Sequence, residues 1–124
     1  SAIKLPTQYM HTLWFTLRFT DTMLYEDVME NLHNSKFLIA TKKMSSNKVF
    51  SFGRDHGYHG RLLSHGIVAE QSLHVKDNVL TGYCFTPQDG NALLSSVAGT
   101  VQHYYKDSWT EKMEIFNRYI FKNI

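Results

Sequence analysis

Histidine is the side chain with the greatest chemical potential in this sequence, because imidazole can accept and donate protons near neutral pH. The 124 residues include 7 histidines. His11 begins an alternating run of apolar and polar residues, in phase with Leu13 and Phe15. An imidazole at the end of a strand can reach a cleft, so His11 is a candidate acid–base residue. The alternative is a hydrogen-bonded structural histidine, which the residues alone favour.

A second candidate is the glycine-rich segment 53–61, Gly-Arg-Asp-His-Gly-Tyr-His-Gly-Arg. Its backbone N–H groups and the guanidinium groups of Arg54 and Arg61 could bind an anion such as phosphate. A surface turn with ordinary ion pairs is the favoured alternative. His56 and His59 have the spacing of a metal-binding pair. Glycines disfavour a helix there and no third ligand is suitably spaced, so no metal site is predicted.

The single cysteine, Cys84, lies in an apolar run between Tyr83 and Phe85. We expect it to be a buried thiol with a raised pKa and therefore inert, rather than a nucleophile. One cysteine excludes an internal disulfide and suits a reducing compartment. No apolar run is long enough to cross a membrane. The sequence therefore predicts a cytoplasmic protein without a membrane partner.

Several elements must position these residues. The alternation over 11–19 predicts a strand with one buried face. A helix capped by Asp21 or Thr22 should follow and end near Asn34, and 37–41 reads as a short buried strand. Segment 44–63 is ambiguous between helix and strand. The apolar positions of the helix are spaced four apart: Leu24, Val28 and Leu32.

The second half of the chain predicts a hairpin and then helices. Strands at 66–75 and 79–85 should flank a turn at Lys76-Asp77-Asn78. Ser108 should begin a capping box with Glu111 at the start of the last helix. Two apolar stripes define the helices, the first made of Leu93, Leu94, Val97, Val101 and Tyr104, the second of Trp109, Met113, Phe116 and Ile120.

These elements indicate one α+β domain over residues 1–124, with an antiparallel or mixed sheet and helices packed on one face. An aromatic fraction of 14% supplies an ample core and excludes a disordered chain. The net charge of +2 is small and dispersed. A nucleic-acid partner is therefore not expected, since it would require a clustered basic surface.

Several segments resemble a known family. Residues 5–11, Leu-Pro-Thr-Gln-Tyr-Met-His, are similar to Val-Pro-Thr-Thr-Leu-Met-His in archaeal-type (type II) glyceraldehyde-3-phosphate dehydrogenases, where that segment begins a long strand. Residues 53–57 are similar to the family's Ala-Arg-Asp-Leu-Gly. The helix at 25–32, and Gln88-Asp89 with the helix after it, also have counterparts. The resemblance covers residues 3–102 and is to the C-terminal catalytic domain.

The resemblance implies a function. His11 aligns with the histidine that activates the catalytic cysteine, and Arg54 and Arg61 would be weaker contacts to the substrate phosphate. The chemistry would be thiolate attack on an aldehyde, hydride transfer to NAD or NADP, and acyl transfer to phosphate. The family's nucleophile lies upstream of the matched segment, and Cys84 does not replace it. Leu13 stands where the family has a second histidine, and Gln8 where it has threonine.

On this resemblance the chain is a fragment of a longer polypeptide whose nucleotide-binding part is absent. We then expect it to be inactive alone, to bind no cofactor, to contact its own nucleotide-binding domain and to form a homo-oligomer. The alternative is a stand-alone, non-enzymatic α+β module for oligomerisation or protein interaction. The two readings differ at His11, which a catalytic role requires to be accessible and a structural role requires to be buried.

Overall fold

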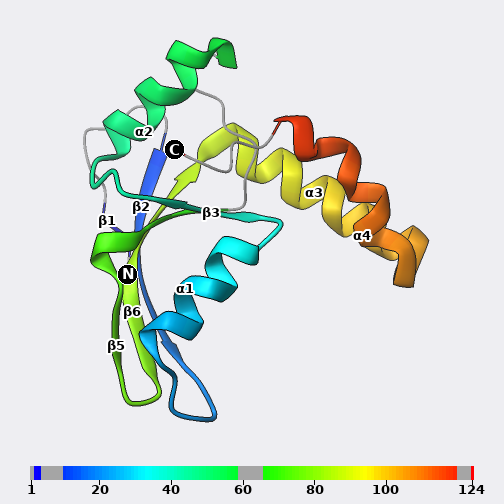
Figure 1. The fold of residues 1–124 in the computed structure, drawn as a ribbon. Coiled ribbons are helices and arrows are strands. Elements are labelled where there is room, and N and C mark those ends of the chain that lie inside the picture. Colours follow the sequence, from blue (N-terminus) through cyan, green and yellow to red (C-terminus); the bar gives the residue numbers. More distant parts are fainter. Residues whose placement is uncertain (1, 4–9, 59–65, 120–123) are drawn as a thin grey trace.

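The computed structural model describes residues 2–3, 10–58, 66–119 and 124 and contains one mixed sheet of six strands (Figure 1). The strand order is β1-β2-β6-β4-β3, and β5 also pairs with β6. The strands are β1 (Ala2–Ile3), β2 (Met10–Arg18), β3 (Leu38–Thr41), β4 (Gly66–Ala69), β5 (His74–Lys76) and β6 (Val79–Pro87). The α-helices are α1 (Tyr25–Asn34), α2 (Ser46–Gly53), α3 (Gln88–Tyr105) and α4 (Trp109–Lys112). None of the helices in the described ranges is long and apolar enough to cross a membrane.

The centre of the sheet is the antiparallel pair β2 and β6, in register from Met10 opposite Pro87 to Arg18 opposite Val79. The strand predicted at 11–19 is therefore confirmed with a shift of one residue. The predicted hairpin is also confirmed, since β5 and β6 are joined through Asp77 and Asn78. Asp77 has φ 54°, a left-handed conformation that aspartate tolerates better than most residues.

The predicted strand at 66–75 is interrupted. A 3₁₀ turn, Glu70–Ser72, separates β4 from β5. The Ser72 hydroxyl donates to the Ala69 carbonyl at 2.7 Å and accepts from the Tyr83 backbone N–H at 2.8 Å. This side chain thus supplies the hydrogen bond that an uninterrupted strand would have given to β6, which is why the sheet tolerates the break.

Parallel pairing makes the sheet mixed. β3 and β4 are parallel, with Ile39 opposite Ile67, and α2 connects them. The ambiguous segment 44–63 thus contains a helix in its first half, followed by a π-helical turn, Arg54–Tyr58. A helical crossover is the usual way to join two parallel strands.

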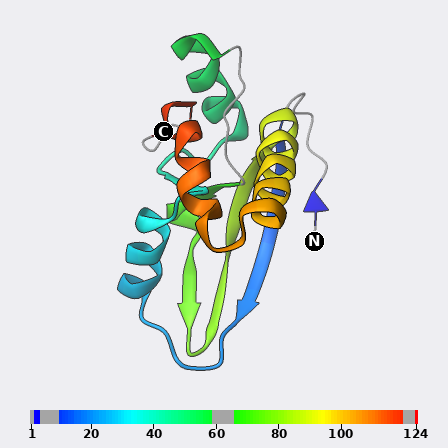
Figure 2. The same cartoon turned by 90° about the vertical axis from the view of Figure 1, so that its right-hand side faces the viewer.

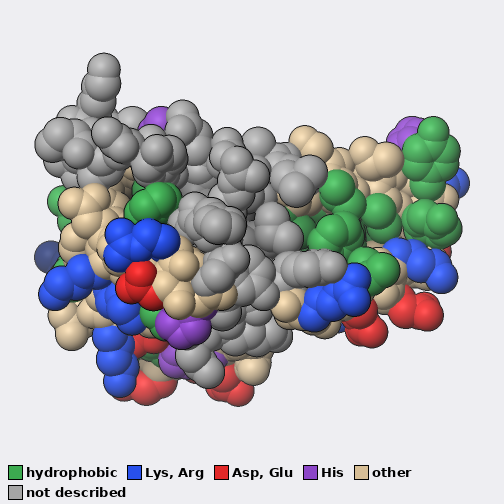
Figure 3. Space-filling model, turned by 90° about the horizontal axis from the view of Figure 1, so that it is seen from above, with side chains coloured by type: hydrophobic (Ala, Val, Ile, Leu, Met, Phe, Trp, Pro, Cys, Tyr) green, Lys and Arg blue, Asp and Glu red, His purple; other side chains and the backbone are tan. Residues whose placement is uncertain are grey.

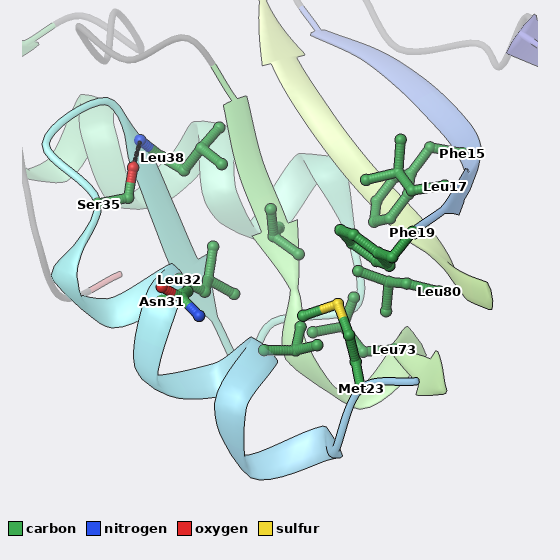
Figure 4. Close-up of a pocket in the computed structure, with 12 residues that line it drawn as sticks. Phe15, Leu17, Phe19, Met23, Asn31, Leu32, Ser35, Leu38, Leu73 and Leu80 are labelled. Atoms are coloured by element: carbon green, nitrogen blue, oxygen red, sulfur yellow. Dashed lines mark hydrogen bonds between the residues drawn. The ribbon is translucent and has the colours of Figure 1, made fainter. Parts of the chain in front are cut away.

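The helices cover both faces of the sheet, so the prediction that they pack on one face is wrong. Val49 of α2 packs with Ile39 and Ile67. Leu32 of α1 instead lies near Leu38 and Val68 (Figure 4). Leu38 is the neighbour of Ile39 in β3, and Val68 is the neighbour of Ile67 in β4. Successive side chains of a strand point to opposite faces, so α1 and α2 lie on opposite sides. Strands that are apolar on both faces require this arrangement.

The chain after β6 forms a helical hairpin with its own core (Figure 2). Leu94 and Ala98 of α3 pack with Met113, and Trp109 stacks on Phe37 with ring centroids 5.6 Å apart. Most of the predicted stripes are confirmed in this cluster. Tyr104 is an exception, because 75% of it is exposed. Ile120 lies outside the described residues, and nothing is described of the Leu93 side chain.

The predicted helix caps are wrong. Leu24 precedes α1 without a side-chain cap, so neither Asp21 nor Thr22 caps it. The Ser108 hydroxyl donates to the Tyr105 carbonyl at 3.2 Å instead of forming a capping box. Ser108 is the last residue of the 3₁₀ turn Lys106–Ser108 and directly precedes α4. Its hydroxyl therefore points toward the preceding turn and not toward the first turn of α4.

Candidate functional site

His11 is accessible. It is the second residue of β2, lies opposite Thr86 of β6, and has an exposed side chain. Its ring makes no hydrogen bond or ion pair to any part of the chain that the structure describes. Exposure is one of the two features that an acid–base role requires, the other being a cleft that the imidazole faces, and it differs from the buried, bonded environment of a structural histidine. The role itself stays a prediction.

The surroundings of His11 are the end of the sheet at which β2 begins and β6 ends (Figure 1). Helix α2 packs against β2 and stands at this same end, and α3 starts there directly after β6. Three elements that are distant in sequence therefore meet around the beginning of β2. Because α2 packs on the face of the sheet opposite to His11, a cleft that uses His11 would have to be completed by elements other than α2.

The glycine-rich segment is only partly described. Arg54 follows α2, and its Nε donates to Asp55 Oδ1 at 2.9 Å, with both side chains more than half exposed. An exposed pair of this kind contributes little stability and does not prevent Arg54 from binding an anion. Arg61 and His59 lie outside the described residues. The two predicted arginine contacts are thus not brought together by what the structure describes.

His56 is held in place locally. Its Nδ1 donates to the Phe52 carbonyl at 2.7 Å, and its ring stacks on Phe52 with centroids 4.1 Å apart. Within the described ranges, no group of three potential metal ligands comes together. The π-helical turn explains why the glycines at 53 and 57 do not simply end the helix as the sequence suggested.

Cys84 is a free, partly buried thiol in the middle of the sheet. It lies in β6 opposite Leu13 of β2 and Val68 of β4. Burial raises the pKa of its thiol, because the charged thiolate is disfavoured away from water. The predicted raised pKa is confirmed in direction, but the side chain is only partly buried rather than fully buried. A raised pKa keeps the thiol largely protonated at neutral pH, which disfavours a nucleophilic role.

Sequence reasoning missed a groove of about 320 Å³ between α1 and the sheet (Figure 4). Its mouth is bordered by Leu17 and Leu38, which are 48% and 42% exposed. We call it the α1 groove. It is lined by Phe15, Leu17, Phe19, Met23, Val28, Asn31, Leu32, Ser35, Leu38, Val68, Leu73 and Leu80.

The floor of the α1 groove depends on Gly82 of β6, which lies opposite Phe15. A Cβ at position 82 would lie 2.8 Å from Leu73 Cδ2 and 3.0 Å from Phe15 Cζ. Glycine thus allows both side chains to lie flat against the sheet. Any larger residue would lift them into the hollow.

Helix α1 is attached at both ends, with the α1 groove beneath its middle. Near its start, the Met23 backbone N–H donates to the Asp77 carbonyl at 3.2 Å. Near its end, His33 Nε2 lies 3.2 Å from Glu70 Oε1. Between these contacts, Val28 and Leu32 face the sheet across the hollow. The apolar spacing of the helix indicated its buried face, but only the attachment points determine its distance from the sheet.

No protein-family model and no curated protein sequence matches this chain. What the chain does must therefore be inferred from its own residues.

Proposed function

We propose that this chain is the substrate-side domain of a glyceraldehyde-3-phosphate-dehydrogenase-like oxidoreductase, in which His11 is the acid–base residue. The observation that carries the proposal is the accessible imidazole of His11 at the beginning of the central strand β2. The matched segment 5–11 ends at this residue, so sequence resemblance and exposure agree on the same position. The order of strand, helix and buried strand at the start of the chain is also the order on which the resemblance rests.

In this proposal His11 takes the proton of a thiol supplied from outside these 124 residues, because the raised pKa of the partly buried Cys84 disfavours it as the nucleophile. The resulting thiolate attacks the aldehyde carbon. NAD or NADP bound to a separate nucleotide-binding domain would supply the hydride acceptor, and inorganic phosphate would take the acyl group. Arg54, and Arg61 beyond the described residues, are weaker candidates for the substrate phosphate. The reaction takes place in the cytoplasm.

The test is an assay of the natural polypeptide that contains this chain, with glyceraldehyde 3-phosphate, phosphate and either NAD or NADP. We expect His11→Asn to lower kcat/KM by roughly 100- to 10,000-fold, as removal of a general base does. His74→Asn is the matched control, because His74 is also an exposed histidine on a strand of the same sheet. Wild-type rates in His11→Asn, or no activity with either cofactor, would exclude the proposal.

A second candidate is a non-enzymatic interaction module, which the outer end of the helical hairpin favours. Tyr104 and Tyr105, at the end of α3, are 75% and 51% exposed. Figure 3 shows hydrophobic side chains gathered at this end of the molecule beside charged ones. Aromatic residues on a projecting surface are typical of interfaces. A second copy of the chain is the partner we propose for this end, as a homo-oligomer in either reading.

Sedimentation equilibrium tests whether the outer end of the helical hairpin binds a second copy of the chain. If the end binds a second copy, Tyr104→Ser with Tyr105→Ser should convert the oligomer to monomer and leave the unfolding transition in place. Leu24→Ser is the control, since Leu24 is 63% exposed at the start of α1 and not on the hairpin. A protein that is monomeric before substitution would remove this candidate.

A further inference from the structure

The α1 groove has the dimensions of a small-molecule site. Its volume of about 320 Å³ is at the lower end of the range for ligand pockets, roughly 300–1,000 Å³. A protein cavity of about 150 Å³ suffices for benzene, so this volume suits a body about twice as large. Two fused aromatic rings, or an aliphatic group of similar size, would fill it.

A protein partner fits the groove less well. Stable protein interfaces use about 20–30 residues on each side, whereas 12 residues line the α1 groove. A helix has a diameter of about 10 Å and would need a long, shallow channel. The groove is instead enclosed by α1 on one side, by the sheet beneath, and by the chain around Phe19 and Met23 at one end (Figure 4).

The lining also specifies the chemistry of the ligand. None of the lining residues is charged, so an ion would lose its hydration without gaining a partner. The two polar lining residues, Asn31 and Ser35, both come from the last part of α1 and the residue after it. A ligand with one polar group would therefore bind with that group toward this end.

Both polar residues retain hydrogen-bonding capacity. The Asn31 amide nitrogen donates to the Asp27 carbonyl at 2.8 Å, which leaves the amide oxygen as an acceptor. Ser35 Oγ accepts from the backbone N–H of Leu38 at 3.0 Å and of Phe37 at 3.3 Å. Its own O–H remains to donate. The end of the groove thus offers one acceptor and one donor, which a hydroxyl group can satisfy together.

We propose that the α1 groove binds a small uncharged molecule with an apolar body about the size of two fused rings and one hydroxyl-like group directed toward Asn31 and Ser35. The proposal goes beyond the oxidoreductase function and does not depend on it. His11 lies on the same face of β2 as Phe15 but four residues earlier, about 13 Å along the strand at about 3.3 Å per residue. A ligand in the groove would therefore not occupy the space around His11.

The test is a titration of the methyl-labelled protein with 2-naphthol, followed by NMR. We expect saturable shifts of the Val68, Leu73 and Leu80 methyl groups, and intermolecular NOEs from 2-naphthol to them. Ile39 and Ile67, on the opposite face of β3 and β4, should give no NOEs. 2-Methylnaphthalene lacks the hydroxyl group and should bind several-fold more weakly, because Asn31 and Ser35 would lose their partner.

A pair of glycine substitutions provides the matched control. Gly82→Ala lifts Leu73 and Phe15 into the groove and should weaken 2-naphthol binding roughly tenfold or more. Gly99→Ala adds the same methyl group to α3 at a point where nothing lies within 4 Å, and should leave binding unchanged. If Gly82→Ala does not fold, the NOEs of the wild-type protein decide the question.

Three results would overturn the proposal. The first is the absence of saturable shifts up to the solubility limit of 2-naphthol. The second is a set of NOEs to methyl groups outside the α1 groove, or unchanged binding in folded Gly82→Ala. The third is a shift of the groove methyl groups with protein concentration alone, which would mean that a second copy of the chain covers the groove.

Discussion

The two faces of the sheet are packed very differently, although the same strands supply both. On the α2 face, Val49 and Ile67 are completely buried and Ile39 is 2% exposed. On the α1 face, their neighbours surround a hollow of about 320 Å³, and Leu38 is 42% exposed. Helix α2 connects two adjacent parallel strands and packs directly against them. Helix α1 lies between β2 and β3 in the chain and buries Val28 and Leu32, yet a hollow remains between it and the sheet.

The difference shows that an apolar helix face does not by itself produce a filled core. Both helices have apolar residues at helical spacing, and both turn them toward the sheet. Filling depends on the distance at which the connections hold the helix, and on side-chain volumes such as the missing Cβ at Gly82. A fully packed face stabilises the fold. A face with a hollow contributes less stability, and its accessible apolar surface can bind a ligand.

The sharpest test of this contrast uses two adjacent residues of β3. Ile39→Ala should lower the free energy of unfolding by about 3 kcal/mol, because it leaves a cavity in a filled core. Leu38→Ala removes a side chain of the same size from the rim of the α1 groove and should cost under about 1 kcal/mol. Urea unfolding monitored by circular dichroism measures both. Equal losses would mean that the α1 face is as tightly packed as the α2 face.

The sequence predicted those parts of the structure that depend on local patterns. The alternation of β2, the spacing of Val28 and Leu32 in α1, and the Asp-Asn turn each reflect interactions within a few residues. It did not predict on which face each helix packs, because residues such as Ile39 and Leu38 are both apolar and give no preference. The caps failed for a similar reason, since competing backbone contacts redirected the hydroxyl of Ser108.

The candidate site was predictable only as single residues. Cys84 is partly buried, as its place in an apolar strand indicates. His11 is exposed although it is in phase with Leu13 and Phe15, because it lies at the beginning of the strand. The α1 groove joins residues from α1, β2, β3, β4 and β6. Its existence depends on how far α1 stands from the sheet, a tertiary quantity that no spacing of residues encodes. Gly82 was the one local signal, as a glycine within a strand often marks a close approach of side chains.

A smaller effect is expected at Thr12, which lies on the packed face opposite Phe85. Its hydroxyl is buried, and no hydrogen-bond partner for it occurs in the described parts of the chain. Thr12→Val replaces the hydroxyl with a methyl group of similar shape and should raise the free energy of unfolding by about 1 kcal/mol. Thr16→Val, on the same face but exposed, should change it by less than about 0.5 kcal/mol. A loss of stability in Thr12→Val would show that an internal water molecule satisfies the hydroxyl.

The smallest effect concerns Cys84, which lies on the α1 face with Gly82 and Leu80. The pKa of its thiol depends on how far water reaches that face. Burial raises the pKa of its thiol above the ordinary value of 9.0, so the folded state keeps a proton that the unfolded state releases. The associated stability is fully present below this ordinary value and is lost as the pH rises through the folded-state pKa. Cys84→Ala lacks this titration, and every other ionisable side chain is the same in the two proteins. The unfolding free energy of the wild type relative to Cys84→Ala, measured in urea under reducing conditions, should therefore fall between pH 8 and about pH 10. A difference that stays constant would mean that the thiol ionises as readily in the folded protein, and hence that water reaches the α1 face beyond the groove.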